Sequence, residues 1–129
     1  MYGSFVLGYY DPVIGANIAN DINKALLSMN SSPVNIRIAP TGEQLIGSVC
    51  RDCSALFSYN GLGKGMSGVD AIKKAKQTRP ELPAYLLHNG FDSRLFREAQ
   101  KAGAIYIDTS SPTALKQMAN IVKWHLIDR

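Results

Sequence analysis

Short apolar runs alternate along the chain with longer segments in which apolar residues recur every three or four positions. The longer segments have the period of amphipathic helices. The short runs are nearly continuous in apolar character, as is typical of strands that are buried on both faces of a parallel sheet. They predict five strands, at Phe5–Tyr9, Val34–Ala39, Ala55–Tyr59, Ala84–His88 and Ala104–Ile107.

Capping residues indicate where the helices begin and end. Asp11-Pro12 supplies a cap and a proline at the first helical position, and Thr41–Gln44 has the pattern of a capping box. Arg79-Pro80 is expected to stop the third helix, and Gly103 to end the fourth. The last three helices are therefore predicted at Met66–Thr78, Asp92–Ala102 and Pro112–Ile127.

This regular alternation of strand and helix predicts an α/β fold. Each parallel crossover needs a right-handed helical return, so helices are expected on both faces of the sheet. The natural arrangement is a doubly wound, flavodoxin-like sheet of five parallel strands in the order 2-1-3-4-5, formed by one domain that spans residues 1–129. Its binding crevice is expected at the carboxyl ends of the first and third strands, and the loops that matter are those that follow Tyr9, Tyr59, His88 and Ile107.

Composition excludes several classes of function. Hydrophobic residues make up 46% of the chain and charged residues 19%, and the apolar runs are only as long as strands, so no membrane span is expected. Met1–Ser4 lacks a basic leader, and a cytoplasmic location is expected. The net charge of +4 includes no long run of basic residues, so direct nucleic-acid binding is not expected.

The two cysteines, Cys50 and Cys53, have the spacing of a redox-active pair. They are predicted between the end of a helix and the start of a strand, whereas a reactive pair needs a helix N-terminus. Structural thiols are the favoured interpretation. His88 and His125 are the only histidines and neither has metal-ligand spacing to the cysteines, so neither a metal nor another cofactor is expected.

The loop from Asn60 to Gly68 contains Gly63-Lys64-Gly65-Met66-Ser67-Gly68, which fits the G-x-G-x-x-G pattern of dinucleotide sites. The pattern starts three residues after the predicted strand, belongs to the third strand-helix unit, and lacks the acidic residue expected after the next strand. A flexible loop whose glycines permit positive φ is the simpler interpretation.

The segment from Asp52 to Lys76 resembles the third strand, following loop and third helix of response-regulator receiver domains. Gly65–Ile72 matches that family's loop into the third helix, Arg79–Pro83 its approach to the fourth strand, and Phe96–Ala104 its fourth helix and turn. The resemblance covers essentially the whole chain. It implies a receiver fold and a role in two-component signal transduction.

The residues that such domains use for phosphorylation are replaced here. The resemblance places Tyr9 and Tyr10 where receivers carry the acidic residues that hold a divalent cation, and Asn60 where they carry the aspartate that accepts the phosphoryl group. His88 replaces the hydroxyl residue that ends strand four, and Ser110, or Ser111 if the loop is shifted, replaces the lysine that ends strand five. An amide cannot act as that nucleophile, so no catalytic residue is expected. Tyr9 and Tyr10 are expected to fill the space of the ion.

Helical periodicity also indicates an outward surface. Leu115, Met118, Ala119, Val122 and Leu126 form one stripe of the last helix that is expected to face the sheet. Trp124 then points away from the core, with Ile121 and Ile127 on its flanks. On the preceding helix Arg94, Arg97 and Lys101 form an outward basic stripe. A solvated charged face, and a tryptophan folded back on its own surface, are the simpler alternatives.

The sequence thus predicts a non-enzymatic pseudo-receiver that signals through protein–protein contact without phosphorylation. Its partner is expected to be a signalling protein, an effector domain of the same polypeptide or a second copy bound through the fourth and fifth helices. The binding residues would be Arg94, Arg97, Lys101, Ile121 and Trp124. The alternative is a flavodoxin-like domain that binds a small molecule or nucleotide with the glycine-rich loop and His88.

Overall fold

Five strands form one parallel sheet in the order β2-β1-β3-β4-β5, which confirms the predicted topology. The computed structural model describes residues 4–49, 52–63 and 65–127. Along the chain the elements are β1 (Ser4–Gly8), α1 (Pro12–Ser28), β2 (Asn35–Ala39), α2 (Gly42–Ser48), β3 (Cys53–Tyr59), α3 (Gly68–Thr78), β4 (Ala84–His88), α4 (Ser93–Lys101), β5 (Ile105–Asp108) and α5 (Ala114–Ile127).

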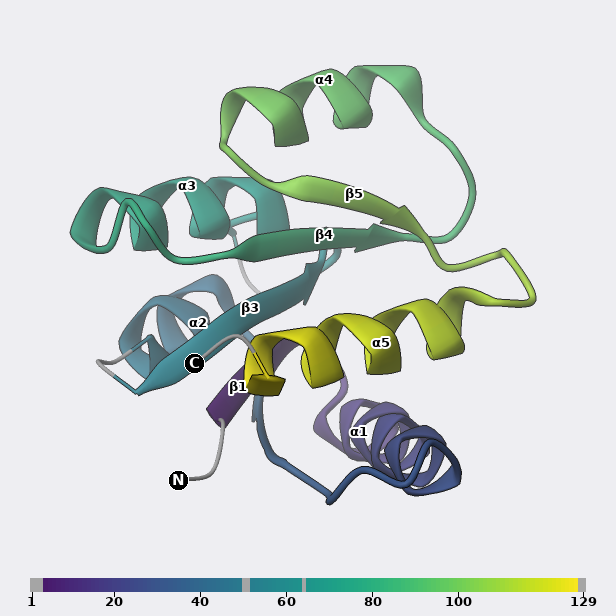
Figure 1. Ribbon diagram of the computed structural model, residues 1–129. Helices are drawn as coiled ribbons and strands as arrows, with labels where there is room; N and C mark the ends of the chain where they lie inside the picture. Colours follow the sequence, from purple (N-terminus) through teal and green to yellow (C-terminus); the bar gives the residue numbers. More distant parts are fainter. Residues whose placement is uncertain (1–3, 50–51, 64, 128–129) are drawn as a thin grey trace.

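Two hydrophobic cores lie on opposite faces of this sheet. Helices α1 and α5 cover one face, and α2, α3 and α4 cover the other (Figure 1). Successive residues of β1 serve different cores, because Val6 faces one while Phe5 and Leu7 face the other. The central strands are buried on both faces as predicted, but the edge strands are not: Ile105 of β5 is 60% exposed.

The predicted caps are confirmed, and they explain small shifts in helix bounds. Oδ1 of Asp11 accepts a hydrogen bond from the Val13 backbone nitrogen, 2.9 Å away. Helix α3 begins two residues later than expected, because the Ser67 hydroxyl caps it by accepting from the Asp70 nitrogen. Helix α5 begins at Ala114 because a turn based on Ser111 precedes it.

The inner face of α5 differs from the predicted stripe. Met118, Ala119 and Val122 are buried, but Leu115 is 37% exposed, so its prediction as a core residue is wrong. His125 is buried instead, because the Tyr85 hydroxyl of β4 hydrogen-bonds to its ring. The side chain of Ile127 lies outside the described residues.

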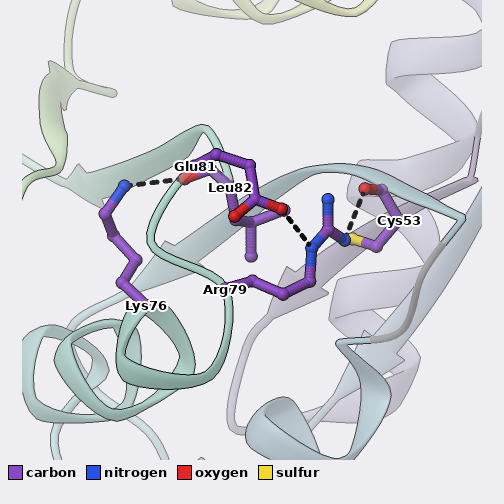
Figure 2. Close-up of polar contacts among 5 residues, drawn as sticks. All are labelled: Cys53, Lys76, Arg79, Glu81 and Leu82. Atoms are coloured by element: carbon purple, nitrogen blue, oxygen red, sulfur yellow. Dashed lines mark hydrogen bonds and ion pairs between the residues drawn. The ribbon is translucent and has the colours of Figure 1, made fainter.

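Polar contacts hold together the amino ends of the central strands (Figure 2). Nη1 of Arg79 donates to the Cys53 carbonyl at 3.0 Å, while its Nε pairs with the Glu81 carboxylate at 3.2 Å. Nζ of Lys76 donates to the Leu82 carbonyl at 2.8 Å. The loop after α3 is thereby fixed to the start of β3. Cys53 is buried at that point, and Cys50 lies outside the described residues.

Candidate functional site

The carboxyl ends of β1, β3 and β4 bring most of the predicted site residues together. Tyr9 and Asn60 directly follow β1 and β3, and His88 is the last residue of β4. An open cleft of about 260 Å³ lies between them, lined by Tyr9, Tyr10, Tyr59, Asn60, Gly61, Leu87, His88 and Asn89. Ser110 does not line this cleft.

The tyrosines border the cleft and leave it open. The rings of Tyr9 and Tyr10 stack with their centroids 5.0 Å apart, and the Tyr59 ring meets Tyr9 edge to face, also at 5.0 Å. Tyr10 is 57% exposed. The expectation that Tyr9 and Tyr10 fill this space is therefore wrong, because Tyr10 lies mostly in solvent on the stacked face of Tyr9.

Asn60 has a structural role at the start of α3. Its backbone carbonyl accepts a hydrogen bond from the Gly68 nitrogen at 2.8 Å, and its Oδ1 accepts from the Val69 nitrogen at 3.1 Å. Two of the N–H groups that a helix leaves unpaired in its first turn are thus satisfied. The side-chain nitrogen Nδ2 is a donor that has no hydrogen-bond partner within the described residues, and Asn60 lines the cleft.

A hydrogen-bond network defines the proton position on His88. The Tyr106 hydroxyl donates its single proton to the Gly90 carbonyl at 2.6 Å and accepts from the Asp92 nitrogen at 3.1 Å. Nδ1 of His88 lies 3.0 Å from the same carbonyl and 3.1 Å from the Tyr106 oxygen, and both of these atoms are then acceptors. Nδ1 must therefore carry a proton. In the neutral ring Nε2 is left as an acceptor.

Ser110 belongs to a separate turn at the end of β5. Its backbone nitrogen and hydroxyl both donate to Oδ1 of Asp108, at 2.9 and 2.6 Å, and the Gly90 nitrogen donates to the same atom at 2.9 Å. These hydrogen bonds, chiefly that from the Ser110 hydroxyl, hold the pKa of Asp108 below its ordinary value. Asp108 thus ties the loop after β4 to the loop after β5.

The cleft carries no charged side chain among its described lining residues. Burial raises the pKa of Tyr59 above its ordinary value, although a hydrogen bond with Thr109 opposes the shift. Burial also raises the pKa of Tyr9, and the nearby Tyr10 and Asp11 add to the shift. Both phenols are therefore neutral at physiological pH.

Magnesium does not fit this set of side chains. Mg²⁺ is bound by hard oxygen ligands, chiefly carboxylates, and none lines the described cleft. The nearest carboxylate along the chain, that of Asp11, accepts from the first turn of α1. Across residues 4–49, 52–63 and 65–127, no three His, Cys, Asp or Glu side chains are grouped closely enough to hold a metal ion.

A second cleft adjoins the first and has a different character. Its volume is about 250 Å³, and it is lined by Asn60, His88, Asp92, Arg94, Leu95 and Glu98. Asn60 and His88 are common to both clefts. The second cleft has charges of both signs, whereas the first is neutral and aromatic.

The predicted outward surface is exposed. Arg94, Arg97 and Lys101 are exposed on α4, and Trp124 is 57% exposed on α5 although its ring also meets that of His125 edge to face. Ile121 is half-buried. A groove of about 410 Å³ is lined by Tyr85, Ile105, Asn120, Ile121 and Trp124.

Sequence reasoning missed three kinds of residue. Tyr59 was read only as the end of a strand, although its position beside Asn60 places it at the crevice. Tyr106 and Asp108 lie on β5, and their alternation with the buried Ile107 was the signal that could have identified them. The sequence around Ile105 does not indicate that this residue lines the groove beside Trp124, because its exposure results from the position of β5 at the edge of the sheet.

Comparisons with known proteins support the fold. No protein-family model and no curated protein matches the chain. The BeF3-activated receiver domain of DrrB superimposes with a TM-score of 0.74 and 22% identity, covering 100% of both chains. The response regulator DrrB of Thermotoga maritima superimposes with a TM-score of 0.73 and 21% sequence identity, covering 99% of this chain and 54% of that chain. This chain therefore spans about half the length of that response regulator.

The chemotaxis protein CheY4 of Vibrio cholerae is similar at a TM-score of 0.70 and 13% identity, over 95% of this chain and 99% of that chain. None of the helices in the described residues has the length and apolar composition needed to span a bilayer. At such identities the likeness concerns the architecture alone. The chain thus adopts the flavodoxin-like fold of response-regulator receiver domains.

Proposed function

We propose that the protein is a pseudo-receiver, a regulatory module that signals through protein–protein contact without being phosphorylated. The observation that carries the proposal is the neutral cleft at the carboxyl ends of β1, β3 and β4. In the fold of a receiver domain, Asn60 occupies the position after β3, and its side-chain oxygen is used to cap α3. The described lining offers neither the nucleophile nor the cation ligands that phosphoryl transfer requires.

It follows from this proposal that the domain has no catalytic residue and needs no cofactor. The domain would then transmit its signal through a surface that binds a partner protein. The surface that we propose, called here the α4–α5 face, consists of Arg94, Arg97, Lys101, Ile121 and Trp124 together with Ile105. It combines an apolar groove next to an exposed tryptophan with exposed basic side chains. Such an arrangement is typical of an interface with an apolar anchor and a polar rim.

The chemistry of this face favours a partner with an apolar side chain that enters the groove and acidic side chains that meet α4. A signalling protein or an effector domain of the same polypeptide would supply these. A second copy of the chain could bind through α4 and α5 if the grooves pack against each other across a two-fold axis.

The test uses two substitutions and a matched control. Sedimentation equilibrium measures self-association, and affinity capture followed by direct binding of the identified protein measures hetero-association. Trp124→Ala and Arg97→Glu are each expected to weaken the association at least about tenfold, because one removes an interface anchor and the other reverses a rim charge. Lys24→Glu makes the same charge reversal on the exposed side of α1 and is expected to leave it unchanged.

If every measurable association survived Trp124→Ala and Arg97→Glu, the α4–α5 face would not be the signalling surface. Modification of the unaltered protein by a small phosphodonor would contradict the proposal independently.

One observation favours the alternative of a small-molecule-binding domain, because His88 and the loop residue Gly61 both line the neutral cleft. The glycine-rich loop itself does not support a nucleotide. The Gly63 nitrogen donates to the Pro40 carbonyl at 2.9 Å and the Gly68 nitrogen donates to Asn60, so these N–H groups are already used within the protein. Phosphate binding by a glycine loop depends on such groups being available.

A further inference from the structure

The neutral cleft has the properties of a ligand site. The geometry points to binding of an uncharged, planar heterocycle of one or two fused rings, whose hydrogen-bonding edge is recognised by Asn60 and His88 while its faces contact tyrosine rings. This inference goes beyond the proposed signalling function and does not depend on it.

The two recognition groups are complementary. Nδ2 of Asn60 is a donor without a partner in the described residues, and Nε2 of His88 is an acceptor because Nδ1 holds its proton within the Tyr106 network. Both residues line the cleft. A ring that carries a carbonyl next to an N–H, as a cyclic amide does, offers one acceptor and one donor side by side.

Neither recognition group is free to turn away. Oδ1 of Asn60 accepts a hydrogen bond from the Val69 nitrogen at 3.1 Å, which restrains the side-chain amide. The His88 ring is held through Nδ1 by the Gly90 carbonyl and the Tyr106 oxygen. The donor and the acceptor are therefore preorganised, so that little rotamer entropy is lost when a ligand binds.

Aromatic side chains form the walls. Tyr9 and Tyr59 meet at an interplanar angle of 85° with their centroids 5.0 Å apart, so they form a corner of two ring surfaces. Leu87 adds apolar surface. Stacked and edge-to-face contacts with these tyrosine rings stabilise a bound flat ring, in addition to the stabilisation from burying its apolar surface.

The size and neutrality of the cleft restrict the ligand further. A volume of about 260 Å³ is slightly below the range of roughly 300–1,000 Å³ that is usual for small-molecule sites, so it favours one or two rings over a nucleotide or a flavin with its side chain. A phosphate group in this cleft would have no positively charged side chain beside it, and a cation would have no carboxylate. Either charge would lose hydration without being paired, and an uncharged ring avoids this free-energy cost.

The test titrates the protein with three probes that share the carbonyl and N–H edge: uracil, hypoxanthine and quinazolin-4-one. Binding is followed in ¹H–¹⁵N and aromatic NMR spectra. Saturable shifts are expected at the Asn60 side-chain amide and at the Tyr9 and Tyr59 rings. Blocking the donor in 1-methylhypoxanthine is expected to weaken binding about tenfold relative to hypoxanthine, the effect of one hydrogen bond. Inosine 5′-monophosphate is expected not to bind.

A matched pair of variants checks the role of Asn60. Asn60→Asp keeps an oxygen that accepts from the Val69 nitrogen but removes the Nδ2 donor, and it is expected to weaken binding of the tightest probe by about tenfold or more. Asn20→Asp makes the same chemical change at an exposed position of α1, outside the cleft, and is expected to have no effect. The inference is overturned if none of the three probes binds saturably, if the shifts map to the Trp124 groove, or if the methylated probe binds as well as its parent.

Discussion

The hydroxyl of Tyr85 and Nε2 of His125 lie 2.8 Å apart in the interior, where they join β4 to α5. Both residues are buried, with 6% and 8% of their surface exposed. The Tyr85 ring also stacks on Phe57 of β3 with centroids 4.9 Å apart. The last helix is thus fixed to the central sheet by a polar contact as well as by its apolar face.

Replacing Tyr85 by phenylalanine is expected to lower the free energy of unfolding by about 1–3 kcal/mol, because His125 loses a buried hydrogen-bond partner while the apolar ring remains. Urea denaturation followed by circular dichroism measures the change. Tyr10→Phe removes a hydroxyl from an exposed ring and serves as the control, with little change expected. Equal stability of the Tyr85→Phe variant and the parent protein would show that the hydrogen bond contributes nothing net.

Stability is also expected to fall in alkaline solution. Burial raises the pKa of Tyr85 and of Tyr59 above the ordinary value of 10.0, so the folded protein retains these protons more strongly than the unfolded chain. Their contribution is fully present below pH 10.0 and is lost as the pH rises from there through the folded-state pKa. Unfolding midpoints measured between about pH 9 and about pH 11 should fall less in Tyr85→Phe than in the parent. A parallel decline in both proteins would contradict this assignment.

The fold was predictable because its signals are local and repeat along the chain. Asp11, Thr41 and Asp92 each accept from the first turn of the helix that they precede, and Asp11 and Thr41 were recognisable as caps. Val6 and Leu56 lie in apolar runs of strand length, and alternation with helices then leaves little choice of topology. The exposure of Ile105 could not be predicted, because it depends on which strand becomes an edge.

The site was predictable only in part, for a related reason. Tyr9, Asn60 and His88 come together because each stands at the carboxyl end of a neighbouring parallel strand. The network around Tyr106 depends on rotamers and on the path of two loops, which a pattern of residue types does not determine. Helical periodicity likewise assigned Leu115 to the core and missed His125, because their burial is decided by what the sheet presents to α5.

Gly68 is predicted to be indispensable for the start of α3. A Cβ atom at this position would overlap the Tyr59 carbonyl oxygen, a backbone atom that cannot move without disturbing β3. Gly68→Ala should therefore lower the unfolding free energy by about 1–3 kcal/mol, the usual cost of overpacking. Gly47→Ala is the matched control: the same change in an exposed position of α2 meets no atom within 4 Å and should stabilise by about 0.5–1 kcal/mol. Chemical denaturation of both variants decides the point, and equal effects would contradict it.

Arg79 is predicted to stabilise the loop after α3 more through its hydrogen bond to the Cys53 carbonyl than through its ion pair with Glu81 (Figure 2). Arg79→Ala should lower the unfolding free energy by about 1–2 kcal/mol, because a half-buried carbonyl loses a charged donor. Glu81→Gln should have a much smaller effect, since the Glu81 side chain is 72% exposed. An effect of Glu81→Gln equal to that of Arg79→Ala would show that the ion pair dominates.

Acid titration offers a separate check of the Arg79–Glu81 pair. The hydrogen bond from its own backbone, followed by that from Arg79, lowers the pKa of Glu81 from its ordinary value of 4.5. A lowered folded-state pKa contributes stability that is present above pH 4.5 and is lost as the pH falls through the folded-state value. NMR titration of the Glu81 carboxyl should show the lowered value in the parent and a smaller shift in Arg79→Ala.

Asn60→Asp is expected not to create a phosphorylation site. Such a variant would place a carboxylate after β3, but under the proposed function Tyr9 and Tyr10 would still stand where cation ligands are needed, and Ser110 would still be bound to Asp108. Because phosphoryl transfer depends on positioned positive charge more than on the nucleophile alone, one carboxylate is insufficient. Intact-mass spectrometry after treatment with acetyl phosphate and Mg²⁺ should show no added phosphoryl group, in either the variant or the parent. Urea denaturation would first confirm that the variant is folded. A phosphoryl group on residue 60 of the variant would mean that other residues supply the cation site, and that the assignment of Tyr9 and Tyr10 is wrong.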